Sequence, residues 1–183
     1  AGFSPGQAQF VTMAIDAGTP YVSFKDNDNG GKASVMKYNG SSWEDVGSPG
    51  FSPGIAQYTS IAIHNGNPYV AYRDDANNDK ARVDFFNGST WNQLGGLMGD
   101  GQTANNVLRI NGNTAHTVFV DGAASFAVQV HEYVFASGSC SITSSGLSNI
   151  QCNDNGTPSD PSDDYITFDL NPSGVDLGTD YTV

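Results

Sequence analysis

The sequence predicts an all-β fold made of repeated four-stranded units, and three observations lead to this prediction. Residues 2–49 return as residues 50–97 without insertion or deletion, so that Gly2-Phe3-Ser4-Pro5-Gly6 recurs 48 positions later as Gly50-Phe51-Ser52-Pro53-Gly54. Of the 19 acidic residues 17 are aspartates, and there are 22 glycines; both residue types favour turns over helices. No stretch of useful length has the period of an amphipathic helix.

Each repeat contains four short stretches rich in β-forming residues and separated by turn residues. The strands expected in the first repeat are 8–15, 20–25, 32–38 and 43–46, and those in the second are 56–63, 68–73, 80–86 and 91–94. Asn87-Gly88, between the last two, is a favoured hairpin turn. Four antiparallel strands recurring at a fixed period of this length are typical of a β-propeller blade.

A degenerate third copy is expected over residues 98–136. Ala104 takes the place of Ala8 and Ala56, while 118–121 and 126–134 stand for the second and third strands. The register slips by about one residue, and no Asn-Gly-x-x-Trp sequence follows. Residues 1–136 are therefore predicted to form a partial β-propeller with two clear blades and one degenerate blade, since terminal repeats are commonly atypical.

Residues 137–183 are predicted to form a separate, truncated β-sandwich-like segment. Serine, cysteine, threonine, aspartate and proline replace the aromatic pattern there, and 165–170 is the clearest strand. The segment is much shorter than the roughly 100 residues of a complete sandwich domain.

The repeat motifs also resemble a known kind of protein. Pro20-Tyr21-Val22 and its copy Pro68-Tyr69-Val70, with the two Asn-Gly-Ser-x-Trp hairpins, resemble propeller-type repeats of large secreted and cell-surface proteins of the Bacteroidetes type. The acidic run 152–164 resembles the start of β-sandwich repeat modules of such proteins. The resemblance is close over residues 2–96, and it implies a secreted or cell-surface location.

The charge of the chain restricts its partners. Seven basic residues against 19 acidic ones give a net charge of -12. This balance repels phosphate backbones and anionic membrane surfaces, so nucleic acid is not expected as a partner. No apolar run approaches the ~20 residues that a membrane-spanning helix needs.

Two acidic loops are candidates for calcium. The C-terminal loop could supply the six to eight oxygens that the ion takes, and the alternative is a solvated acidic turn; its carboxylates are Asp154, Asp160, Asp163 and Asp164. The loop 25–31 has alternating acids as well, but Asp28 becomes Ala76 in the second repeat. We therefore interpret that loop as a polar hairpin connection.

Cys140 and Cys152 are the two cysteines of the chain and lie twelve positions apart. In an oxidising compartment they are expected to form a disulfide, and two free thiols are the alternative. His64, His116 and His131 do not have the spacing of a metal site.

The candidate ligand-contacting residues are aromatic. Tyr21, Trp43, Tyr69 and Trp91 either pack between blades or line shallow clefts where an aromatic face meets the C–H face of a sugar ring. No convergent pair of carboxylates with an arginine cluster is evident, so the chain is not expected to be an enzyme. The leading hypothesis is a fragment of a larger surface protein that serves adhesion or extracellular binding. A propeller lectin and the remnant of a glycosidase propeller are the alternatives, and open blade faces suggest self-association.

Overall fold

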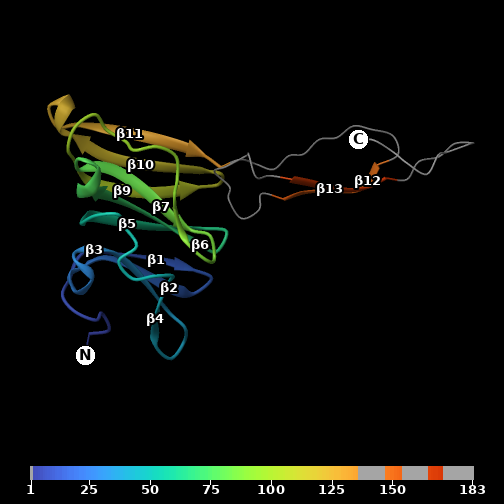
Figure 1. Ribbon diagram of the computed structural model, residues 1–183, viewed down its shortest axis with the longest axis horizontal. Helices are drawn as coiled ribbons and strands as arrows, with labels where there is room; N and C mark the ends of the chain where they lie inside the picture. Colours follow the sequence, from blue (N-terminus) through green and yellow to red (C-terminus); the bar gives the residue numbers. More distant parts are fainter. Residues whose placement is uncertain (1, 136–146, 154–164, 171–183) are drawn as a thin grey trace, which may run out of the picture. The chain divides into compact units, whose positions relative to one another are not determined.

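The computed structural model describes residues 2–135, 147–153 and 165–170 (Figure 1). The chain divides into two compact units, Ala1–Phe135 and Ala136–Val183, and each is described by itself. No helix among the described residues is long and apolar enough to cross a membrane.

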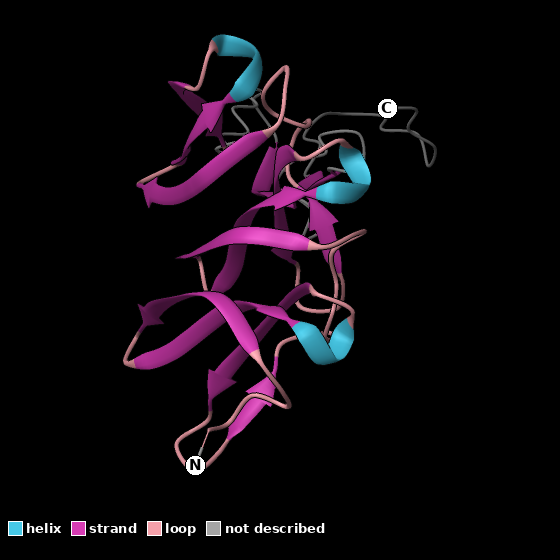
Figure 2. Cartoon of the chain, turned by 90° about the vertical axis from the view of Figure 1, so that its left-hand side faces the viewer, coloured by secondary structure: helices cyan, strands magenta, loops and turns pink. Residues whose placement is uncertain are grey.

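The first unit consists of three antiparallel sheets that follow one another along the chain (Figures 1 and 2). Blade 1 has the strand order β1-β2-β3-β4, and its strands are β1 (Ala8–Asp16), β2 (Thr19–Asp26), β3 (Lys32–Tyr38) and β4 (Trp43–Asp45). Blade 2 has the order β5-β6-β7-β8, with β5 (Ala56–His64), β6 (Asn67–Asp74), β7 (Lys80–Phe86) and β8 (Trp91–Gln93). Blade 3 has three described strands, β9 (Thr103–Asn111), β10 (Thr114–Asp121) and β11 (Ala127–Val134). The predicted all-β fold with two clear blades and one degenerate blade is confirmed.

Short 3₁₀ turns connect the second and third strand of each blade. They are η1 (Asn27–Asn29), η2 (Asp75–Asn77) and η3 (Gly122–Ala124). The aspartate that ends the preceding strand caps each turn by accepting a hydrogen bond from the backbone N–H two residues later. These three aspartates, Asp26, Asp74 and Asp121, are buried, so a carboxylate is enclosed at the same place in every blade.

The third blade is aligned one residue differently from the expectation. Ala56 pairs with Asp74, whereas Thr103, and not Ala104, pairs with Asp121. The physical reason is a shorter connection: Leu94 and Met98 bond to β7 as Val46 and Phe51 bond to β3, but one residue fewer separates them. Blade 3 therefore follows blade 2 at an offset of 47 residues instead of 48.

The first strands of the blades, β1, β5 and β9, hold the stack together. Each contains a residue with a positive φ at which the pairing with the next strand shifts, and these residues are Phe10, Tyr58 and Asn105. Hydroxyl groups link neighbouring first strands, because Thr12 Oγ1 accepts from Ile61 N at 3.2 Å and Ser60 Oγ accepts from Leu108 N at 3.0 Å.

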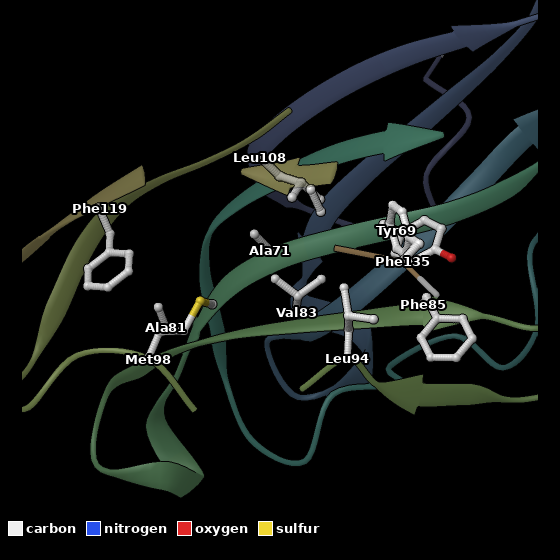
Figure 3. Packing of buried hydrophobic residues seen from close by; sticks show 11 residues of the cluster. Tyr69, Ala71, Ala81, Val83, Phe85, Leu94, Met98, Leu108, Phe119 and Phe135 are labelled. Carbon is white, nitrogen blue, oxygen red and sulfur yellow. The ribbon is translucent and has the colours of Figure 1, made fainter. Parts of the chain in front are cut away.

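Two apolar clusters lie between the blades. One joins blades 1 and 2 through Ala33, Val35, Val46, Ile61 and Tyr72. The other joins blades 2 and 3 and includes Ala81, Val83, Met98, Leu108 and Phe119 (Figure 3). Equivalent positions of the repeat fill both clusters. Each repeat therefore carries one set of residues for the contact with the preceding blade and another set for the contact with the following blade.

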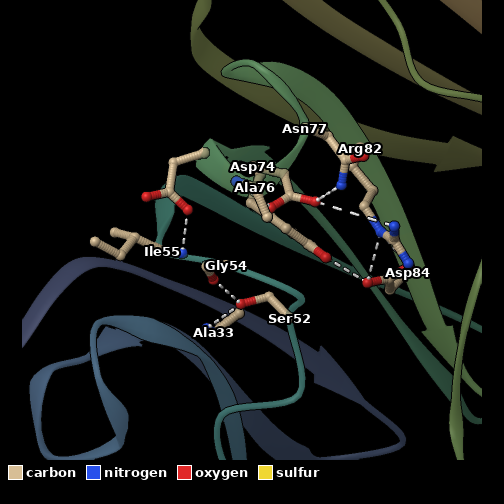
Figure 4. A network of polar contacts seen from close by, with 11 residues as sticks. Ala33, Ser52, Gly54, Ile55, Asp74, Ala76, Asn77, Arg82 and Asp84 are labelled. Carbon is tan, nitrogen blue, oxygen red and sulfur yellow. Dashed lines mark hydrogen bonds and ion pairs between the residues drawn. The ribbon is translucent and has the colours of Figure 1, made fainter.

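The segment that enters each blade also completes the edge of the blade before it. Ala33 N donates to Ser52 Oγ at 2.9 Å (Figure 4), and Phe51 N donates to Ala33 O at the same distance. Met98 exchanges hydrogen bonds of 2.8 and 3.1 Å with Ala81 in the same way. β4 and β8 pair only with the C-terminal part of β3 and β7. The N-terminal part of each of these third strands pairs with the segment that enters the following blade.

The second unit contains a two-stranded antiparallel sheet of β12 (Leu147–Asn153) and β13 (Tyr165–Leu170). The strand predicted at 165–170 is confirmed.

Candidate functional site

The four aromatic residues singled out in the sequence have different surroundings. Tyr69 is only 1% exposed, because Phe85 and Phe135 lie with their ring centroids 5.4 and 5.2 Å from its own. A ligand cannot reach it, so the expectation that Tyr69 contacts a ligand is wrong. Its equivalent in blade 1, Tyr21, is half-buried.

Trp43 and Trp91 occupy equivalent places, as the repeat predicts. Trp43 stacks on Phe3 with a centroid separation of 4.0 Å, and Trp91 stacks on Phe51 at 3.8 Å. Trp91 also donates from Nε1 to Val46 O of blade 1 at 3.0 Å. These contacts show that Trp91 packs between two blades while part of it stays exposed, and a ligand contact of Trp91 stays a prediction.

Gly47 shows how closely the rings approach blade 1. It has a φ of 69°, and a Cβ at this position would lie 2.6 Å from the Phe86 ring and 2.8 Å from Trp91 Nε1. A side chain larger than hydrogen is therefore excluded on both grounds.

A groove on blade 1 is the best candidate binding site. Strand pairing places Tyr21 opposite Lys37 and Lys37 opposite Glu44, so one row across β2, β3 and β4 carries an aromatic ring, a cation and a carboxylate. The groove has a volume of about 430 Å³, and its lining consists of Gly18, Thr19, Pro20, Tyr21, Lys37, Tyr38, Asn39, Gly40 and Glu44.

Polar contacts fix the wall of the groove. Lys37 Nζ lies 3.3 Å from Glu44 Oε1, and Asn39 Nδ2 donates to Glu44 Oε2 at 3.1 Å. These two neighbours, Asn39 first, hold the pKa of Glu44 below its ordinary value. Glu44 is therefore ionised at neutral pH and can accept hydrogen bonds from a ligand.

The hairpin turn beside the groove positions Asn39. Its side-chain oxygen accepts from Ser41 N at 3.0 Å and from Ser42 N at 2.9 Å. Gly40, which lies between Asn39 and Ser41, has a φ of 101°, which a glycine adopts without strain. The Asn-Gly-Ser turn thus serves both to close the hairpin and to present the amide.

In blade 2 the corresponding row is covered, and the residue that covers it comes from blade 3. Phe135 of blade 3 covers Tyr69 and stacks on His64 at 4.3 Å. At the offset of 47 residues its equivalent in blade 2 is Gly88, which has no side chain to cover Tyr21. All residues that line the groove belong to blade 1, and Tyr21 is left half-buried.

A smaller cleft of about 130 Å³ lies between blades 2 and 3. Val83, Leu94, Met98 and Ala115 form an apolar part of its lining, and Tyr133 is among its remaining residues. In the interface of blades 1 and 2 the Phe51–Trp91 stack lies in the corresponding region. Met98 replaces that phenylalanine, and the sequence has no third tryptophan.

The structure also reveals a buried polar network in blade 2 that sequence reasoning missed (Figure 4). The Tyr72 hydroxyl donates to Asp84 Oδ2, and Arg82 Nε lies 2.9 Å from Asp84 Oδ1 and its Nη1 4.0 Å from Asp74 Oδ2. Burial is the main cause that raises the pKa of Asp84 and of Tyr72. Because Tyr72 and Asp84 are enclosed between blades, they form a structural group and not a site for substrate.

The loop 25–31 is a hairpin connection, as interpreted from the repeat. The carboxylate of Asp26 accepts from Asp28 N at 3.1 Å, from Asn29 Nδ2 at 2.8 Å and from Ser34 Oγ at 2.8 Å. Its oxygens are thus bonded within the blade. No group of three or more histidine, cysteine or acidic residues among the described residues could hold a metal ion.

The remaining predicted residues lie outside the described part of the chain. This applies to the proposed calcium ligands Asp154, Asp160, Asp163 and Asp164, and to Cys140. Cys152 lies in β12, for which the backbone alone is described. The calcium site and the disulfide stay predictions.

Comparisons with known proteins give no family. No protein-family model matches the sequence, and no curated protein matches it. Among solved structures, "Bacteroides ovatus Xyloglucan PUL GH43B" is 15% identical, with 67% of this chain and 25% of that chain covered and a TM-score of 0.43.

A second solved structure, a glycoside hydrolase family 43 arabinoxylan arabinofuranohydrolase from Bacillus subtilis in complex with cellotetraose, is 12% identical. The match covers 70% of this chain and 35% of that chain, with a TM-score of 0.40. The chain thus spans about a quarter to a third of the length of these two proteins. The fold of the chain is therefore stated from its own structure, which is an all-β stack of propeller-like blades.

Proposed function

We propose that this chain is a non-catalytic extracellular binding module and that the groove over Tyr21 binds carbohydrate. The observation that carries the proposal is the row Tyr21–Lys37–Glu44 in an open groove, with the Asn39 amide at its side. Sugar sites combine an aromatic face with a small number of placed polar groups, which fix the orientation of the hydroxyl groups.

The charges in the groove favour a neutral polar ligand. Lys37 and Glu44 form an ion pair at 3.3 Å, so neither a phosphate nor a cationic peptide meets an unbalanced charge there. The Glu44 carboxylate accepts from hydroxyl groups and Lys37 donates to them, while Asn39 holds Glu44 in place. The net charge of -12 further disfavours anionic ligands such as nucleic acid.

A binding role is supported over hydrolysis by the number of carboxylates. Hydrolysis of a glycosidic bond commonly uses two carboxyl groups about 5–9.5 Å apart. Glu44 is the single acidic residue in the lining of the groove, and Asp84 of blade 2 is enclosed by Tyr72 and Arg82. A glycosidase remnant remains the second candidate, since it would keep a sugar groove while losing its acids. Adhesion at a cell surface is the role in which we place such a module.

The test is a glycan array followed by calorimetric titration of the best neutral oligosaccharide. We expect binding to the unmodified chain in the micromolar to millimolar range. Glu44→Gln and Tyr21→Ala should each weaken it by about tenfold or more, because one removes the charged acceptor and the other the aromatic face.

The chain offers a matched control in Glu132→Gln, which changes its other glutamate on blade 3. The Glu44 side chain is 44% exposed, so its substitution should leave the fold intact, and circular dichroism checks this for each variant. If no glycan binds at millimolar concentration, or if Glu44→Gln and Glu132→Gln bind equally well, the groove is not a sugar site.

A further inference from the structure

Each end of the three-blade stack exposes a surface that the repeat buries inside the stack. At the blade 1 end the exposed residue is Met13, which is 61% exposed. Its equivalents in the next two blades are Ile61 and Leu108, which are 3% and 0% exposed because each packs on the blade before it. Met13 is therefore an interface residue of the repeat that has no preceding blade within the described chain.

At the blade 3 end the complementary half is exposed. Val128 and Val130 of β11 are 67% and 57% exposed. The residues at these two places in blades 1 and 2 are buried members of the inter-blade clusters, and they are Ala33, Val35, Ala81 and Val83. Inside the stack, Ile61 lies in one cluster with Ala33 and Val35, and Leu108 lies in one cluster with Ala81 and Val83. One end of the stack thus carries the first half of a contact and the other end carries the second half.

Backbone groups match in the same way. β11 lies at the edge of its sheet, and none of the described residues pairs with its free side. In the two preceding blades the residue at the Val128 position is bonded by the entering segment of the next repeat, through Phe51 and Met98. Residues 2–6 have the same sequence as residues 50–54, including Phe3 and Ser4, so they carry the groups that such an edge receives.

We propose that two copies of this chain associate head to tail, with the blade 3 face of one copy packed on the blade 1 face of the other. Met13 of each copy then lies on Val128 and Val130 of its partner, and residues 2–6 pair with the free edge of the partner's β11. The same contact forms twice and closes a ring of six blades, which lies within the range of about four to eight found in propellers. The occupant of each open face is a blade, because the equivalent positions of the repeat pack against a neighbouring blade at both internal interfaces.

Three residues make the contact between copies differ from the internal ones. Val107 stands where Thr12 and Ser60 accept a hydrogen bond, so that bond is not repeated. His116 and Glu132, whose side chains lie 3.2 Å apart, stand where blade 2 has Tyr69 and Phe85. We therefore expect a dimer that dissociates on dilution and not a permanent one.

The experiment is sedimentation velocity on the chain at about 0.15 M salt, where the Debye length is about 8 Å and the repulsion between two acidic chains is screened. We expect a concentration-dependent species of twice the 19.2 kDa of one chain. Met13→Asp and Val130→Asp should each raise the dissociation constant by at least about 100-fold, because each leaves a charge in an apolar contact. Both residues are exposed in the single chain, so neither change should unfold it.

Mixing the two variants tests the head-to-tail arrangement. Met13→Asp leaves the blade 3 face intact and Val130→Asp leaves the blade 1 face intact, so the mixture regains one of the two contacts and forms a measurable heterodimer. A dimer made by identical faces would not recover in this way. Ser89→Asp, in the exposed turn after β7, adds the same charge away from both faces and should leave the dimer unchanged.

A chain that stays monomeric at millimolar concentration would overturn the proposal, and so would an open series of larger oligomers or a mixture that does not associate. All three substitutions lie outside the Tyr21 groove, so these results are independent of whether that groove binds sugar.

Discussion

Replacing Trp91 by alanine tests whether the stack is held together between blades and not within them. Trp91 stacks on Phe51 at 3.8 Å and donates to Val46 O at 3.0 Å, and it belongs to the apolar surroundings of the cluster between blades 1 and 2. Truncating a fully buried tryptophan costs about 3–5 kcal/mol. Since Trp91 is half-buried, we expect a loss of about 3 kcal/mol in the free energy of unfolding.

Trp43 is the matched control that the repeat provides. It has the same stack on Phe3, but no blade of the described chain lies beyond it, and Phe3 is itself exposed. We expect Trp43→Ala to cost about 1–2 kcal/mol, mainly from the lost ring contact. Trp91→Phe keeps an aromatic ring and loses the bond to Val46, so its expected cost is about 1 kcal/mol.

The assay is urea unfolding followed by circular dichroism, because the variants change the fluorescence of the chain. The slope of free energy against urea should be unchanged if only stability differs. Equal losses for Trp43→Ala and Trp91→Ala would refute the reasoning, since the contact between blades would then contribute nothing beyond the ring stack.

Three further predictions concern buried and acidic groups. Backbone N–H groups, that of Asp100 first, lower the pKa of Asp121, so its contribution to stability is present above the unfolded value of about 3.9 and is lost as the pH falls through the folded value. Asp121→Asn should therefore lower the urea midpoint at about pH 7, and the difference from the unmodified chain should shrink towards about pH 2; a constant difference would contradict the linkage. Replacing Tyr72, Arg82 and Asp84 together by phenylalanine, serine and methionine, the residues of blade 1 at these places, should leave the stability equal or higher. Arg82→Ser alone should cost about 3–5 kcal/mol, because the buried Asp84 carboxylate loses its cationic partner and keeps only the bond from Tyr72. Similar losses in both variants would show that the network stabilises the fold. Millimolar calcium should raise the melting temperature relative to a chelator, and the rise should be lost in Asp160→Asn; identical melting in both buffers would leave the loop as a solvated turn.

The strands were predictable because the repeat supplies each observation twice. The expected limits of β3 and β7 agree with the structure, and the other strands of the first two blades differ from the expectation by one residue at one or both ends. Asp26, Asp74 and Asp121 could also have been recognised, since an aspartate ends the second strand in all three copies. Local sequence and strand periodicity are sufficient for these features.

The site could not be predicted in the same way, because it depends on differences between repeats. Tyr21 and Tyr69 stand in the same motif, yet Tyr21 lines a groove and Tyr69 is buried. Tyr69 is covered by a residue far along the chain, Phe135, whereas the groove at Tyr21 is lined by blade 1 residues alone. The Tyr72–Asp84 bond was hidden for a similar reason, since neither of its residues recurs in blade 1.

The pairing of each blade's edge by the following entry segment has a consequence for how such a chain can grow by duplication. A copied stretch of 47 or 48 residues brings with it a blade and also the segment that closes the blade before it, with Phe51 or Met98 bonded to the alanine of the preceding third strand. Inserting or deleting one unit therefore leaves every remaining junction of the same kind. Lineages can change the number of blades in one genetic step, without a period in which an edge must be rebuilt residue by residue.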